Sequence, residues 1–175
     1  MWRALALIFL GVSTAALGDP QEGLVLSDRG IDAYQVLTTP PVFWPLLTSV
    51  RARGLALAAA GRLDEAEAQY RKVWQNGREG KYRNMHYELA AWGLGELLRS
   101  KKDLAGAAIA YELVNQAPNP DPDILQKANL AAGEMYDLLQ KRDLAMKAYE
   151  AVLTGRADSG QADQARRYIR EAYRE

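Results

Sequence analysis

Residues able to do covalent or metal chemistry are few in this chain. His86 is the single histidine among 175 residues, and there is no cysteine. His86-Tyr87-Glu88 has the His-x-Glu spacing of zinc deaminases, but the Pro-Cys-x-x-Cys that supplies their other ligands is absent. A zinc site draws three or four ligands from Cys, His and carboxylates. We therefore expect His86 to be a surface or packing residue and the chain to have no metal site.

Other catalytic patterns are equally incomplete. A serine nucleophile needs a histidine base, and no Gly-x-Ser-x-Gly motif occurs. The stretch Gly77 to Lys81 is too short for a phosphate-binding loop and lacks its following Ser or Thr. Glu96, Glu134 and Asp137 can face one groove as acids, but the charged wall of a binding module explains them more simply. We expect no catalytic residue, no cofactor and no enzymatic activity.

The N-terminus has the pattern of a secretory signal. A short positive start, Met1 to Arg3, precedes an apolar run from Ala4 to Leu17, and Ala16-Leu17-Gly18 fits a cleavage site. The run is shorter than the roughly 20 residues of a spanning helix. Residues 1–18 are therefore expected to be a signal peptide, with an uncleaved anchor as the alternative. The lack of cysteine and of a glycosylation sequon suits a bacterial periplasmic or secreted protein.

The charge balance of the chain limits its expected partners. The 22 basic residues balance the 22 acidic ones, which leaves no field to gather nucleic acid or an anionic membrane. We expect neither partner, and no membrane span after signal cleavage.

Residues 19–41 contain Gly23, Gly30 and Pro40-Pro41 and are expected to form an irregular lead-in, with at most a short helix over 28–37. The helical signals of residues 42–175 indicate one helical domain.

The helical signals occur in pairs. Gly61 is expected to end a first helix in a left-handed conformation, and Asn76-Gly77 to end a second. A last helix after Ser159 has an apolar face that includes Ala172 and Tyr173. The other expected helices are 63–75, 82–99, 104–116, 123–140 and 143–153.

One spacing, Gly-x2-(Leu/Tyr)-x8-Ala-x3-Tyr-x2-Val, occurs three times. A glycine inside a helix costs about 0.5–1 kcal/mol relative to alanine, so three at one register indicate close helix packing. The alanine, tyrosine and valine positions are expected to pack between helices. The copies are Gly54, Leu57, Ala66, Tyr70, Val73; Gly95, Leu98, Ala107, Tyr111, Val114; and Gly133, Tyr136, Ala145, Tyr149, Val152.

These residues resemble the tetratricopeptide repeat (TPR). Leu94-Gly95 and the Gly133–Tyr136 pair match its first helix, and Gly61 to Ala66 resembles its inter-helix turn. The glycines lie 41 and 38 residues apart, against about 34 in the standard repeat. The resemblance implies an all-α fold, an α-solenoid of about three TPR-like helix pairs plus a C-terminal capping helix. A plain helix bundle is the alternative.

The resemblance also implies a concave groove lined by the first helix of each pair. Trp92 is the expected anchor, since tryptophan and arginine dominate binding hot spots. Trp92 and Leu130 have a second interpretation, as packing residues against a neighbouring helix. Two basic positions of the family's carboxylate clamp are present, Arg51 and Lys127, but its amide positions are not, so we expect no recognition of a C-terminal carboxylate. The groove residues are Arg51, Leu55, Trp92, Glu96, Arg99, Lys127, Leu130 and Glu134.

The expected function is an exported adaptor or scaffold that binds a protein, as a peptide or helix, in this groove. By analogy with exported repeat proteins, cell-envelope assembly is the expected setting. Two alternatives stay open: a structural homo-oligomer that self-associates through the ends of the array, and a small-ligand binder or enzyme that uses acids in the groove.

Overall fold

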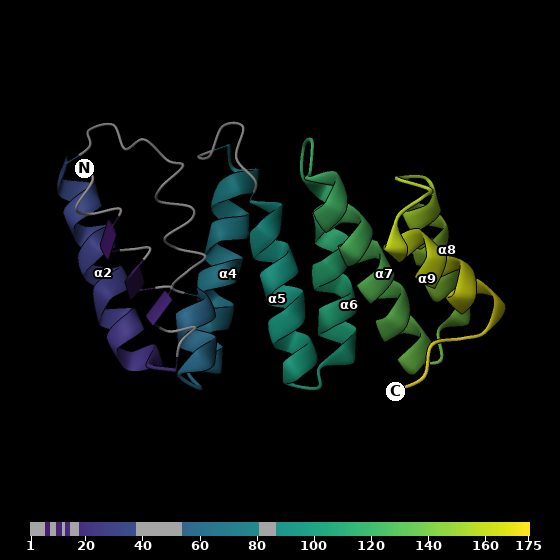
Figure 1. Cartoon of the computed structure of the whole chain (residues 1–175), viewed down its shortest axis with the longest axis horizontal. Coiled ribbons are helices and arrows are strands. Elements are labelled where there is room, and N and C mark those ends of the chain that lie inside the picture. Colours follow the sequence, from purple (N-terminus) through teal and green to yellow (C-terminus); the bar gives the residue numbers. More distant parts are fainter. Residues whose placement is uncertain (1–5, 8–9, 12, 15–17, 38–53, 81–86) are drawn as a thin grey trace. The chain divides into compact units, whose positions relative to one another are not determined.

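The structure is a computed structural model that describes residues 6–7, 10–11, 13–14, 18–37, 54–80 and 87–175 (Figure 1). Within these ranges every regular element is a helix, which confirms the all-α prediction. The chain divides into two compact units, Met1–Gly93 and Leu94–Glu175, and the division falls inside helix α5.

The first unit begins with a helix where the sequence predicts an irregular lead-in. Helix α2 spans Pro20–Leu37, and the Asp19 carboxylate accepts a hydrogen bond from the Glu22 amide at its start, 3.0 Å. Gly23 lies within the helix and is buried, and its carbonyl lies beside Gly11. The prediction of an irregular 19–41 segment is therefore corrected for 20–37. The signal-peptide prediction falls largely outside the described residues and stays a prediction.

Helix α4, Leu63–Arg78, follows the predicted turn. Gly61 has the expected left-handed conformation, φ 73°. The helix continues past Gln75, where the sequence predicts its end. Gly77 is buried in its last turn because the Tyr87 ring occupies the space where a side chain would be; a Cβ there would lie 2.3 Å from that ring. His86 lies outside the described residues.

Helix α5, Glu88–Ser100, contains the division between the units. The second unit continues with α6 (Leu104–Leu113), η1 (Val114–Gln116), α7 (Pro122–Leu138), α8 (Arg142–Leu153) and α9 (Gly160–Arg170). Helix α7 packs against α6, α8 and α9, and α8 packs against α9 (Figure 1). In the described residues no helix is long and apolar enough to cross a membrane.

The repeated positions are core positions, as predicted. All fifteen residues of the three copies are buried. In each copy the tyrosine ring covers the glycine: a Cβ on Gly95 or Gly133 would lie 2.3 Å from Tyr111 or Tyr149, and one on Gly54 would lie 2.8 Å from Tyr70. The glycine and tyrosine positions are therefore interlocked, because each ring occupies the volume of the missing side chain.

Candidate functional site

The predicted groove residues lie in different environments. Arg51 lies outside the described residues. Leu55 is 47% exposed, and Trp92 is partly buried in α5. In the second unit, Lys127 is exposed on α7, whereas Leu130 is only 6% exposed. Leu130 therefore belongs to the core rather than to a binding surface, which follows its alternative interpretation.

The three remaining predicted residues form one charged cluster in the second unit. Arg99 on α5 and Glu134 on α7 form an ion pair, with 3.2 Å between Nη1 and Oε2. Glu96, one turn earlier on α5, accepts a hydrogen bond from the Tyr111 hydroxyl at 2.5 Å. Burial raises the pKa of Glu134 against the opposing effect of Arg99. Burial alone would lower the pKa of Arg99, but Glu134 and other anionic neighbours outweigh it and raise that pKa.

A second cluster surrounds Asp137, one turn after Glu134 on α7. Its side chain is 1% exposed. It accepts hydrogen bonds from the Tyr149 hydroxyl (2.9 Å), from Arg142 Nη1 (2.9 Å) and from the Tyr173 backbone N–H (2.8 Å). A buried carboxylate needs this many donors because removal from water is costly unless its oxygens are paired. Burial, followed by the Asp137 carboxylate, raises the pKa of Tyr149, so its hydroxyl remains a donor.

Arg142 connects this cluster to the end of α9. Its Nη2 donates to the backbone carbonyls of Tyr168 and Ile169, at 2.7 and 2.8 Å. These carbonyls belong to the last turn of α9, where unpaired acceptors and the helix dipole both favour a cation. The helix therefore stops at Arg170, and Glu171 is extended, with φ −138° and ψ 118°.

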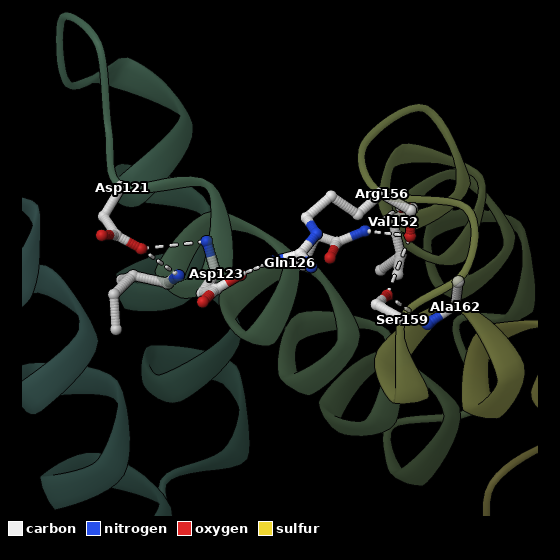
Figure 2. Close-up of polar contacts among 8 residues, drawn as sticks. Asp121, Asp123, Gln126, Val152, Arg156, Ser159 and Ala162 are labelled. Atoms are coloured by element: carbon white, nitrogen blue, oxygen red, sulfur yellow. Dashed lines mark hydrogen bonds and ion pairs between the residues drawn. The ribbon is translucent and has the colours of Figure 1, made fainter.

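The position of α9 is set by a buried amide on α7 (Figure 2). Gln126 is 3% exposed, and its Nε2 donates to the Val152 carbonyl at 2.9 Å and to the Arg156 carbonyl at 3.0 Å. The Val152 carbonyl belongs to the last turn of α8, and the Arg156 carbonyl lies in the connection between α8 and α9. Ser159 then caps α9 by accepting from the Ala162 amide, 3.1 Å. Through these contacts α7 helps to fix the start of α9, whereas Arg142 on α8 binds the other end of α9.

The segment after α9, residues 171–175, lies on the two clusters; we call it the tail segment. Tyr173 donates its backbone N–H to Asp137, and its hydroxyl oxygen accepts from Arg99 Nη2 at 3.4 Å. Its ring lies edge-on against Tyr168, with 5.2 Å between centroids. Glu175 is 4.0 Å from Lys102, in the turn after α5. We call Arg99, Lys102, Asp137 and Tyr168 the tail surface.

The favourable contacts of the tail segment are similar in size to the cost of ordering it. A hydrogen bond to a charged group contributes about 1.5–3 kcal/mol and an exposed ion pair about 0–1 kcal/mol. Ordering the backbone of one residue costs about 1–2 kcal/mol. Glu171, Arg174 and Glu175 are exposed, so little apolar burial adds to these contacts.

Sequence reasoning missed the role of Tyr173. The spacing predicts Tyr173 and Ala172 on the apolar face of the last helix, but α9 ends before them. No glycine or proline marks that end. The stop depends on Arg142, 26 residues or more from the carbonyls that it binds, so no local signal can reveal it. The sequence predicts Asp137 only as part of a charged groove wall.

The described residues contain no group of three His, Cys, Asp or Glu side chains arranged for a metal ion. Comparison of the chain with protein-family models, with curated proteins and with solved structures finds no match in any of the three. The functional conclusion therefore depends on the packing of the helices and on the tail surface.

Proposed function

We propose that this chain is a TPR-like protein-interaction module that binds an extended segment of a partner protein across α5 and α7. Three copies of one Gly–Tyr interlock support the repeat architecture, because an array of identical helix pairs needs the same close approach in each copy. The proposal includes export and a scaffold role in the cell envelope, which the N-terminal pattern supports.

One observation carries the binding proposal. An extended stretch of polypeptide, the tail segment, already lies on Arg99 and Asp137, through one backbone and one side-chain hydrogen bond. A surface that accepts a backbone N–H on a buried carboxylate and an aromatic hydroxyl on an arginine has the donors and acceptors that an extended peptide needs. Glu134 lies beside them as the counter-ion of Arg99.

Photocrosslinking from two exposed lysine positions tests this function. Lys127 lies on α7, on the predicted groove side, and Lys147 lies on α8 as a matched control. A photoreactive residue at 127 is expected to capture a partner protein from the native envelope, whereas the same residue at 147 captures none. Equal capture at both positions would contradict binding on the α7 face. A further arm compares Trp92→Ala, and an unchanged set of partners would remove Trp92 as the anchor.

A further inference from the structure

The tail segment has the features of a ligand rather than of a structural element. It leaves α9 at the extended residue Glu171 and has no regular secondary structure. Its contacts come from three separate elements and a turn: Arg99, Lys102, Asp137 and Tyr168. Its other side chains are exposed or partly exposed. A segment that completed the core would be buried instead.

We propose that residues 171–175 are an exchangeable intramolecular occupant of the tail surface, and that a partner protein displaces them with an extended segment carrying an aromatic residue two positions before an acidic one. This inference rests on the proposed function, because it names the chemistry of the partner and the regulation of the same site. The tail segment then acts as an intramolecular competitor that lowers the apparent affinity of the tail surface for every partner segment.

The pattern of the partner follows from the contacts of the tail segment. The aromatic position is set by Tyr168, against which the Tyr173 ring packs, and by Arg99, which reaches its hydroxyl. The acidic position is a weaker preference, because the pair that Glu175 forms with Lys102 at 4.0 Å is exposed. The residue between them, Arg174, is exposed and carries no requirement. The backbone N–H bound by Asp137 adds affinity for any sequence.

The tail surface has internal partners that preserve it when the tail segment leaves. Glu134 remains paired with Arg99, and Asp137 keeps the donors Tyr149 and Arg142. Arg142 also stays bound to the end of α9. The binding groups are therefore preorganised, so that exchange of one extended segment for another needs no rearrangement of the helices.

Peptide binding to the full chain and to a released form tests the proposal. The probe is a fluorescent peptide with the sequence of residues 169–175, and the control peptide has alanine in place of the tyrosine. A chain ending at Arg170 is expected to bind the probe at least ten times more tightly than the full chain does. The same shortened chain is expected to bind the alanine peptide at least ten times more weakly than it binds the probe. Full-length Tyr173→Ala should bind the probe like the shortened chain, with all other residues kept.

Three results would overturn the exchange. One is equal affinity of the full and shortened chains for the probe. Another is that the chain ending at Arg170 and full-length Tyr173→Ala do not bind the probe although their circular dichroism is unchanged. A third is a loss of helical signal in both variants, which would make the segment part of the fold. A doubled mass of the full chain in light scattering, abolished by Tyr173→Ala, would instead make a second copy the occupant. If the shortened chain captures the same partners through position 127 in the same amount as the full chain does, the exchange is contradicted and the interaction module is left intact.

Discussion

At the scale of single residues, each repeated glycine packs against the tyrosine ring of its own repeat copy. Gly95→Ala places a methyl group where the Tyr111 ring lies, and that ring is fully buried. Overpacking costs about 1–3 kcal/mol, and alanine returns at most about 1 kcal/mol of helix propensity. We expect a net destabilisation of about 1–2 kcal/mol in urea unfolding followed by circular dichroism.

Gly160→Ala is the matched control for this substitution. Gly160 begins α9, and nothing lies within 4 Å of the added Cβ. Its effect is expected to stay within about 0.5 kcal/mol of the unsubstituted chain. If Gly95→Ala proved as stable as Gly160→Ala, the interlock of glycine and tyrosine would not be the reason for the repeat.

Glu134 makes a pH-dependent contribution to stability. Burial raises its pKa in the folded chain above the ordinary value of 4.5, so the folded state binds the proton more tightly than the unfolded state. Linkage then makes this group more favourable to folding as pH falls from its raised pKa towards 4.5. We expect the stability of the unsubstituted chain relative to Glu134→Gln to increase as pH is lowered from 7.5 to 4.5.

Urea unfolding at several pH values measures this difference, with Glu150→Gln as the baseline because Glu150 is exposed on α8. A difference that stays constant, or that reverses sign with falling pH, would show that Arg99 outweighs burial at Glu134. The comparison isolates one carboxyl because the other acids are common to both chains.

At the scale of elements, two contacts join α7 to the connection before α9, and they differ in burial (Figure 2). Gln126 donates one buried and one partly buried hydrogen bond, whereas the Arg156–Asp123 ion pair is 63% exposed at both side chains. Gln126→Leu is expected to cost about 1–3 kcal/mol, because the Val152 and Arg156 carbonyls each lose one of their hydrogen-bond donors. Arg156→Gln is expected to cost less than about 1 kcal/mol.

Thermal unfolding of the two variants decides between buried and exposed contacts. A similar loss from both would mean that the connection is too mobile in solution for the amide to stay in place. A loss confined to Gln126→Leu would also predict weaker placement of α9, and with it weaker binding of the tail segment.

The sequence predicts most helices because their ends carry local signals. Gly61 has the predicted left-handed conformation, and a last helix starts after Ser159 as predicted. The buried faces also follow from spacing, since every repeated position is in the core. The predictions are wrong where a residue distant in the sequence determines the end of a helix. Helix α4 continues through Gly77, which packs against Tyr87, and Arg142 binds the end of α9. The tail surface was missed for the same reason, since it needs Tyr173 outside a helix.

At the scale of the whole molecule, repetition makes each unit depend on its own neighbours. The second unit contains complete copies of the Gly–Tyr interlock, together with every residue of the tail surface. Its largest fully buried side chains include Tyr111, Tyr149 and Met135. Composition and net charge carry none of this information, because a neutral chain of this size suits many folds.

A chain that starts at Tyr87 tests whether this unit is self-sufficient. It keeps α5 to α9 whole, so no helix of the second unit is cut. A domain of this size buries enough surface to fold alone when its core is complete. We expect a helical circular dichroism spectrum, one cooperative urea transition, and, after removal of residues 171–175, binding of the 169–175 peptide as tight as that of the longer chain ending at Arg170. A fragment that is unfolded, or folded but unable to bind the peptide, would mean that residues before Tyr87 are needed to build the tail surface.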